Sequence, residues 1–148
     1  MIKVMVTGAT GVLGRRLVEL ISKTSVPVVA FSGDITDLDV VKANIRKHPD
    51  ITHVFHLAAV VPTTEVEQDF SHAINVNAYG TGLLMSGLIE ANLAPWFCYT
   101  SSSHVYKLSK ALLKEDSPCQ PSSIYGLTKY LGEKNLQILA SHYSGVIA

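Results

Sequence analysis

The sequence has 148 residues, of which 47% are hydrophobic, and its 12 Lys and Arg residues balance 12 Asp and Glu residues. This length is typical of one domain with one core, and a net charge of zero gives no reason to expect nucleic acid or a membrane surface as a partner. Cys98 and Cys119 form neither a disulfide framework nor a zinc-ligand spacing. The sequence shows no signal-peptide pattern and no apolar run of about 18 residues, so we expect a cytoplasmic protein.

Apolar, strand-like runs alternate with helical patterns along the whole sequence. Strands are predicted at residues 2–7, 28–31, 51–57 and 96–100, and 145–148 reads as the opening of a fifth. Helices are predicted from residue 12 towards Pro27, from a cap at Thr36 or Asp37 to about 47, and over 70–92 and 123–141. This alternation predicts an α/β fold, a Rossmann-type parallel sheet with helices on both faces and a ligand site at the carboxyl ends of the strands.

A glycine-rich turn joins the first predicted strand to the first predicted helix, with Gly8, Gly11 and Gly14 in the run 7–14. Such glycines let the backbone turn tightly, let a phosphate approach it, and let the helix pack closely on the sheet. The helix start then presents unpaired N–H groups and a positive dipole end to a pyrophosphate. The alternative is a plain strand-to-helix connection without a ligand. The apolar residues of this helix are predicted to keep largely to one of its faces: Val12, Leu13, Leu17, Val18, Leu20 and Ile21.

Tyr125 and Lys129 lie four residues apart, so they share one face of the predicted helix 123–141. A nearby ammonium group lowers the pKa of a phenol, so Tyr125 is predicted to exchange a proton with a substrate oxygen near neutral pH. Ser102, at the end of a strand, would hold the same oxygen, and Lys129 would reach a ribose. A solvated surface pair is the alternative. His53 and His56 are an odd number of residues apart on one strand, so they point to opposite faces and no metal site is predicted.

Six motifs resemble, in order, the motif series of the extended short-chain dehydrogenases/reductases, and more narrowly of the NAD-dependent epimerase/dehydratase family. They are residues 7–14, 33–37 (Gly-Asp-Ile-Thr-Asp), 56–59 (His-Leu-Ala-Ala), 77–81 (Asn-Ala-Tyr-Gly-Thr), 99–106 (Tyr-Thr-Ser-Ser-Ser-His-Val-Tyr) and 125–129 (Tyr-Gly-Leu-Thr-Lys).

The resemblance implies NAD or NADP as cofactor. The residues that it implies for cofactor binding are Gly8, Gly11, Gly14 and the backbone of Val12 and Leu13 at the pyrophosphate, Asp34 and Ile35 at the adenine, Leu57, Ala58 and Ala59 at the ribose and nicotinamide, and Tyr125 and Lys129. Asn77 belongs to the same set and would steady the backbone that positions the lysine. The implied catalytic set is Ser102, Tyr125 and Lys129, with Tyr125 moving the proton during hydride transfer. Plain explanations compete at single positions: Asp34 as a residue near a helix cap, the alanines as strand-end packing and Asn77 as a polar helix residue.

The resemblance further implies an oxidoreductase or epimerase that acts on a nucleotide sugar or another secondary alcohol or ketone. His104 stands where dehydratases of the family usually carry an acidic residue, so sugar dehydration is less expected. His104 is equally well explained as a substrate contact and as an ordinary loop residue. The helices 70–92 and 123–141 correspond to those that pair across the family's dimers, so we expect a homodimer.

The sequence departs from the family in two places. Only residues 28–31 separate the first helix from Gly33, so the sheet is expected to be shortened by about one strand unit, with Ser32 near the ribose-reading position. This leaves the choice between NAD and NADP open. Residues 1–148 are expected to form a single NAD(P)-binding domain without the family's C-terminal substrate region. A catalytically inactive binding or sensor module, or a fragment of a longer enzyme, therefore remains an alternative.

Overall fold

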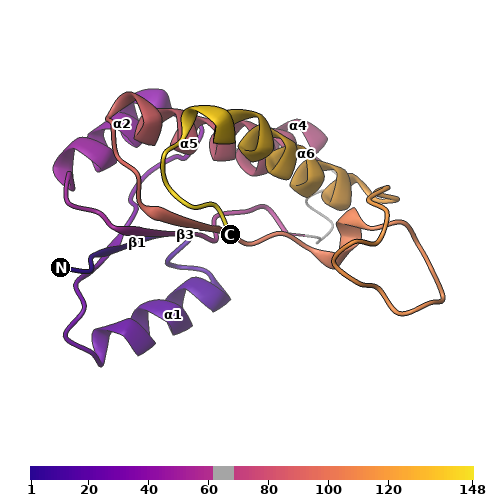
Figure 1. The fold of residues 1–148 in the computed structure, drawn as a ribbon, viewed down its shortest axis with the longest axis horizontal. Helices are drawn as coiled ribbons and strands as arrows, with labels where there is room; N and C mark the ends of the chain where they lie inside the picture. Colours follow the sequence, from indigo (N-terminus) through magenta and orange to yellow (C-terminus); the bar gives the residue numbers. More distant parts are fainter. Residues whose placement is uncertain (62–68) are drawn as a thin grey trace.

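The structure, a computed structural model, describes residues 1–61 and 69–148 and contains one parallel sheet (Figure 1). Its strands have the order β2-β1-β3-β4. They are β1 (Val4–Thr7), β2 (Val28–Ala30), β3 (His53–His56) and β4 (Trp96–Tyr99). Val6 of the central strand β1 pairs with Ala30 on one side and with Phe55 on the other. The carboxyl ends of all four strands therefore meet at one edge, as the predicted fold class requires.

Helices cover both faces of the sheet (Figure 1). Of the described helices, α1 (Val12–Ser22) alone lies on one face. The opposite face carries α2 (Leu38–Lys47), α4 (Phe70–Ile74), the π-helical turn η1 (Asn75–Gly80), α5 (Thr81–Glu90) and α6 (Ile124–Leu139). Two 3₁₀ turns, η2 (Ser103–Val105) and η3 (Ala140–His142), flank α6 along the chain. The predicted α/β class, with helices on both faces, is confirmed.

The unequal cover leaves much of the apolar side of α1 exposed. Val12 and Leu13 are 79% and 64% exposed, and Leu20 is also exposed. Only Gly14 of α1 is buried. Because α1 packs against β1 and β2 without neighbouring helices, only its narrow inner side reaches the sheet, while the main core forms under α2, α5 and α6 around Phe97. An amphipathic pattern shows which side of a helix is apolar, but it does not show how much of that side a neighbour covers.

The long helix predicted over 70–92 is broken by a π-helical turn at its centre. Helix α4 ends at Ile74, residues 75–80 form the wide turn, and α5 begins at Thr81. Polar side chains bind carbonyl groups of this turn: Asn135 Nδ2 donates to the Ala78 oxygen over 2.9 Å, and Thr81 Oγ1 donates to the Asn77 oxygen over 2.8 Å. The bond from Asn135 comes from another helix, α6, so the periodicity of residues 70–92 cannot reveal it.

The remaining boundaries follow local chemistry. Asp37 is the cap of α2, because its side chain accepts hydrogen bonds from the backbone of Asp39 and Val40. Ser123 caps α6 by accepting from Gly126 N. The predicted fifth strand begins to pair with β4, where Phe97 N donates to the Val146 oxygen and Ala148 N donates to the Phe97 oxygen, each over 2.7 Å. Among the described helices, none has the length and apolar character needed to cross a membrane.

The shortened edge of the sheet lies beside β2. This strand pairs with β1, and the chain then passes through Gly33 and Asp34 directly to α2 without forming another strand. The strand next to β1 is thus also the strand that leads to the Gly-Asp motif, as the sequence predicted.

Candidate cofactor and catalytic site

The turn after β1 is packed so closely that two of its glycines have no room for a side chain. Gly8 has a φ of +66°, and a Cβ there would lie 2.7 Å from the backbone nitrogen of Ala58. A Cβ on Gly14 would lie 2.1 Å from the carbonyl oxygen of Gly8. A Cβ on Gly11 would meet the same oxygen at 3.3 Å, which is tight but tolerable. The first turn of α1 is thereby held directly against the end of β1.

The start of α1 is open to an anion. Its cap, Gly11, makes no side-chain capping bond, and the first turn holds no acidic residue. The first N–H groups of a helix have no partner within it and carry the positive end of its dipole. Because Val12 and Leu13 are exposed, these groups lie at the molecular surface beside the glycine turn.

A cavity of about 460 Å³ lies beside this turn at the carboxyl edge of the sheet. The end of β2, the segments that follow β1, β2 and β3, and the π-helical turn meet in it: Gly8, Ala9, Thr10, Ala30, Phe31, Ser32, Gly33, Asp34, Ile35, Ala58 and Val76. Four of the residues predicted to bind the cofactor are among them, at positions 8, 34, 35 and 58. Phe31 and Val76 are lining residues that the sequence analysis did not name. The position of Phe31 at the end of a predicted strand was the available signal, whereas Val76 is brought there by the π-helical turn.

The adenine-side residues have structural roles as well. Asp34 Oδ1 accepts from the backbone and hydroxyl of Thr36, both over 2.8 Å, and these bonds lower the pKa of Asp34. The local-turn explanation of Asp34 therefore holds alongside its place in the cavity. The Ile35 side chain is buried and packs against Gly80. Asn44 holds Ser32 in place by accepting from its N–H over 3.1 Å and donating to its carbonyl over 2.9 Å.

Asn77 connects the end of β3 to α6. Its amide accepts from Val60 N over 2.8 Å and donates to the Val60 oxygen over 2.9 Å. The same amide nitrogen donates to Thr128 Oγ1 over 2.9 Å. Asn77 is fully buried, whereas Leu57, Ala58 and Ala59 are half-buried. Its contacts are with the chain after the alanines and with the helix of Tyr125 and Lys129, which matches the predicted steadying role better than direct cofactor contact.

Ser102 and Tyr125 come together at the carboxyl edge of the sheet. Burial raises the pKa of Tyr125, and a hydrogen bond from Ser102 acts in the opposite direction. His104 lies against both, with its Nδ1 3.0 Å from Ser102 Oγ and its ring edge-on to Tyr125 at 5.7 Å between centroids. His104 is thus a neighbour of the candidate catalytic hydroxyls. Of the adjacent serines, Ser101 instead donates to Glu133.

The predicted lowering of the Tyr125 pKa by Lys129 is wrong for this structure. The ammonium of Lys129 lies 4.1 Å above the centre of the Tyr99 ring, in a cation–π contact. Only 2% of Lys129 is exposed, and this burial lowers its pKa to about 8, while the charge of Glu133 acts to raise it. Four-residue spacing put Tyr125 and Lys129 on one helix face, but the aromatic ring on β4 decided where the ammonium group lies.

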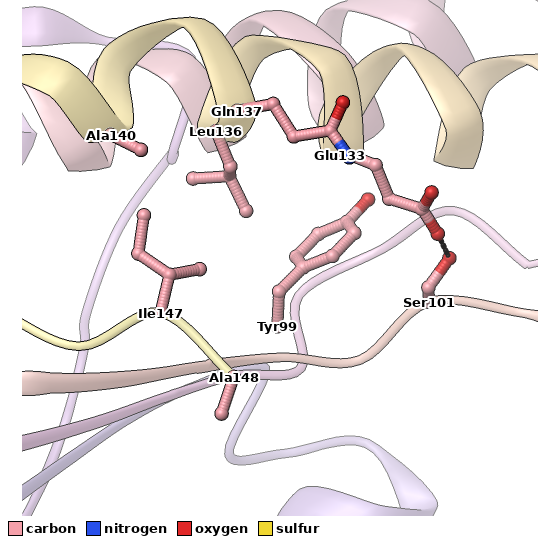
Figure 2. A pocket seen from close by; sticks show the side chains of 8 residues that line it. All are labelled: Tyr99, Ser101, Glu133, Leu136, Gln137, Ala140, Ile147 and Ala148. Atoms are coloured by element: carbon pink, nitrogen blue, oxygen red, sulfur yellow. Dashed lines mark hydrogen bonds between the residues drawn. The ribbon is translucent and has the colours of Figure 1, made fainter. Parts of the chain in front are cut away.

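A second cavity, of about 420 Å³, lies between β4, α6 and the terminal residues 145–148 (Figure 2). Glu133 and Ser101 form its polar end, and Leu136, Ala140 and Ile147 form its apolar end. None of the predicted cofactor-binding residues lines it. Tyr99 lines this cavity, and the ammonium of the candidate catalytic residue Lys129 lies over its ring.

The two histidines of β3 point to opposite faces of the sheet, as predicted. His53 contacts Trp96 at 5.8 Å between ring centroids. His56 is fully buried beside Tyr99, on the face that α5 covers. They cannot share an ion in this arrangement.

A parallel sheet with a glycine turn after β1, a cavity at its carboxyl edge and a tyrosine–lysine helix beside that edge define a Rossmann-type domain of the extended short-chain dehydrogenases/reductases. Residues 2–146 match the family model of the RmlD substrate binding domain, and the chain belongs to this family.

Relatives of known activity lie in the same group. The chain is 33% identical over 134 residues to a dTDP-4-keto-6-deoxy-D-glucose reductase of Streptomyces niveus, covering 88% of this chain and 46% of the relative. It is 32% identical over 117 residues to UDP-glucuronate 4-epimerase 2 of Arabidopsis thaliana, covering 78% of this chain and 26% of that relative. Among solved structures, dTDP-4-dehydrorhamnose reductase from Bacillus anthracis in complex with NADP superposes with a TM-score of 0.85 and 25% identity, covering 99% of this chain and 53% of that one. The chain thus spans about half the length of the reductases that it matches.

Proposed function

We propose that this chain forms the cofactor-binding and catalytic part of an NAD(P)-dependent oxidoreductase or epimerase. Its substrate would be a nucleotide sugar or another secondary alcohol or ketone. The observation that carries the proposal is the contact between Ser102 and Tyr125 at the carboxyl edge of the sheet, where the glycine-turn cavity also lies. Buried Lys129 follows Tyr125 by one turn of the same helix. Because a reductase of a dTDP-linked 4-keto-6-deoxy sugar is among the relatives, such a sugar is the first substrate to test.

The residues at the glycine turn fit a dinucleotide. Gly8 and Gly14 form a cradle that a Cβ would fill, and the adjacent helix start is uncapped, which suits a pyrophosphate. Ser32 and Asp34 would border the adenosine part in the cavity, and Ala58 the central part. A bound nicotinamide dinucleotide would supply or accept the hydride. Asp34 contributes a carboxylate to this cavity, and its Oδ1 accepts from the backbone and the hydroxyl of Thr36.

The proton would pass through Tyr125. Ser102 would hold the substrate oxygen and the phenol oxygen together, and its hydrogen bond favours the phenolate. Lys129 would have to leave the face of Tyr99 to approach a ribose and Tyr125, and the long lysine side chain permits such a rotation. A pKa of about 8 for Lys129 leaves it largely protonated at neutral pH, as this role requires.

The first test is a titration of the purified chain with NADH and with NADPH, following emission of the half-exposed Trp96 and energy transfer to the reduced nicotinamide. Saturable binding would support the proposal, and the tighter of the two ligands would identify the preferred cofactor. Reduction of a dTDP-linked 4-keto-6-deoxy sugar would then test catalysis. Binding without turnover would favour the alternative of a binding or sensor module, or of a part that needs a further substrate region. A folded chain that binds neither cofactor would contradict both.

We also propose that the chain forms a homodimer through α5 and α6. Tyr79 and Ile138 are 54% and 71% exposed and border a shallow groove between the two helices, which Leu83 and Leu139 also line. Burial of such apolar side chains is the usual driving force of subunit association. Light scattering is expected to give twice the monomer mass, and Ile138→Glu is expected to give the monomer. A stable wild-type monomer at high concentration would contradict the proposal.

A further inference from the structure

His56 is a buried residue that the proposed mechanism leaves without a role. It lies on β3 with no exposed surface, and both of its ring nitrogens are engaged. Nδ1 lies 2.7 Å from Thr7 Oγ1, at the end of β1, and Nε2 lies 2.8 Å from Thr81 Oγ1, at the start of α5. The imidazole therefore bridges the strand that precedes the glycine turn and the helix that follows the π-helical turn.

The neighbouring bonds fix the direction of each hydrogen bond and hence the tautomer. Thr81 Oγ1 donates its only proton to the carbonyl oxygen of Asn77, so it must accept from His56 Nε2–H. His56 Nδ1 is then the bare nitrogen and accepts the proton of the Thr7 hydroxyl. Thr7 Oγ1 in turn accepts from Ala58 N over 3.1 Å. Four bonds thus run one way, from the backbone of Ala58 to the carbonyl of Asn77.

A second set of bonds leads from Asn77 to the catalytic helix. Its side-chain nitrogen donates to Thr128 Oγ1, which donates to the carbonyl oxygen of Tyr125 over 2.9 Å. Thr128 is fully buried. The backbone that carries Tyr125 is therefore tied to Asn77, and through Thr81 and His56 to the end of β1.

The surroundings of His56 keep its imidazole neutral. The rings of Phe97 and Tyr99 on β4 lie 5.9 and 5.7 Å from it between centroids, and burial together with the charge of Lys129 on α6 lowers its pKa to about 3. A neutral ring is required, because a protonated Nδ1 could not accept from Thr7. Buried hydrogen-bond chains of one direction hold their members rigidly, since each bond strengthens the next.

We propose that His56, as the neutral Nε2–H tautomer, is a positioning residue that couples the cofactor-binding turn after β1 to the helix that carries Tyr125 and Lys129. The inference rests on the proposed function for the meaning of those two sites. The coupling itself is a property of the folded chain and can be measured without a cofactor.

Two variants separate the halves of the bridge. His56→Gln can place an amide near the position of Nε2 and donate to Thr81, but it loses the acceptor for Thr7. His56→Asn can place an oxygen near the position of Nδ1 and accept from Thr7, but it loses the donor for Thr81. His53→Gln is the matched control, because His53 is on the same strand and faces the opposite side of the sheet. Should both His56 variants fail to fold, Thr81→Val removes the same link, and Thr81→Ser retains the hydroxyl and is expected to rescue it.

The measurements are ¹⁵N NMR of the histidine ring in the wild type, the pKa of Lys129 by NMR of its side chain, and the affinity for NADH and NADPH by calorimetry. We expect the Nε2–H tautomer at neutral pH in the wild type. In His56→Asn and Thr81→Val we expect the Lys129 pKa to shift by about half a unit or more, and the cofactor Kd to rise about tenfold. A purely structural role of His56 would lower the melting temperature without moving the Lys129 pKa in the folded protein.

Three outcomes would overturn the inference. They are an Nδ1–H or protonated imidazole in the wild type, folded His56→Asn or Thr81→Val variants whose Lys129 pKa and cofactor affinity equal those of His53→Gln, or a Thr81→Ser variant no closer to wild type than Thr81→Val. A wild-type chain that binds neither cofactor would contradict the proposed function instead. The tautomer and the Lys129 pKa would still decide the role of His56 in that case.

Discussion

The two ends of the candidate site are built in different ways. The nucleotide end, around Gly8 and Gly14, is shaped by backbone, lies at the surface and has few side-chain bonds. The catalytic end, around Asn77 and Lys129, consists of buried polar side chains that bind one another across three elements. A site made of backbone is sensitive only to substitutions that add bulk. A site made of buried side chains is sensitive to the loss of any one partner, because the remaining groups stay buried and unsatisfied.

The catalytic end gives the largest expected effect. Tyr125→Phe removes the proton that passes to the substrate oxygen, so turnover of a dTDP-linked 4-keto-6-deoxy sugar should fall about 10²–10⁴-fold, while cofactor affinity stays nearly unchanged. Oxidation of NADH or NADPH measures the rate. Tyr130→Phe, on the same helix and outside the site, is the control. Turnover that persists in Tyr125→Phe would remove this residue from the mechanism.

Burial of Lys129 should be visible as a pH dependence of stability. Its pKa is about 8 in the folded protein, against 10.5 for an ordinary lysine. Between these values the unfolded chain binds a proton that the folded chain has lost, so the free energy of unfolding should rise as the pH increases from about 8 to 10. At 1.36 kcal/mol per unit the gain is about 2–3 kcal/mol. Above about pH 10 the raised pKa values of Tyr99 and Tyr125 oppose it.

Urea unfolding across this pH range measures the effect. Lys129→Met should remove the rise, and substitution of Lys134, a half-buried lysine of the same helix, by Met should keep it. Glu133→Gln should shift the rise to lower pH. In the wild type the Glu133 carboxylate favours the charged lysine, so its removal should lower the pKa of Lys129 further. An identical profile in Lys129→Met would show that another group causes the slope.

Added bulk should break the nucleotide end. Gly14→Ala brings a Cβ to 2.1 Å from the Gly8 oxygen, so the turn must shift, whereas Gly11→Ala meets the same oxygen at 3.3 Å. Overpacking costs about 1–3 kcal/mol, so the cofactor Kd should rise about 10–100-fold in Gly14→Ala and much less in Gly11→Ala. The titration with NADH and NADPH measures both variants. Equal losses in the two would show that the close approach at Gly14 does not shape the site.

The smallest expected effect is on cofactor choice. Ser32 lies at the end of β2, where Asn44 fixes its backbone beside the cavity. A carboxylate there can accept a hydrogen bond from a ribose 2′-hydroxyl and repels a 2′-phosphate. Ser32→Asp should therefore raise the ratio of NADPH Kd to NADH Kd about tenfold, with Ser32→Asn as the neutral control. An unchanged ratio of the two Kd values would show that the adenosine ribose does not lie beside Ser32.

The sequence by itself determined the parts of this protein that depend on local order. Alternating apolar runs fixed the parallel strands and the order of the helices, and the glycines at 8, 11 and 14 marked the turn, because a backbone turn is a local property. The motif series also indicated the family, and the single run 28–31 indicated the shortened sheet edge. Even the opposite orientations of His53 and His56 follow from the two-residue period of a strand.

Only the tertiary structure decided how the buried polar groups pair. Lys129 lies over Tyr99 rather than beside Tyr125, the helix over 70–92 opens into a π-helical turn that Asn135 and Thr81 bind, and His56 joins β1 to α5. The contacts of Lys129 with Tyr99, of Asn135 with Ala78 and of His56 with Thr7 and Thr81 each join residues at least 25 positions apart in the chain. The cost of leaving a polar group unpaired in the core selects such partners, and this cost acts only after the strands and helices have packed.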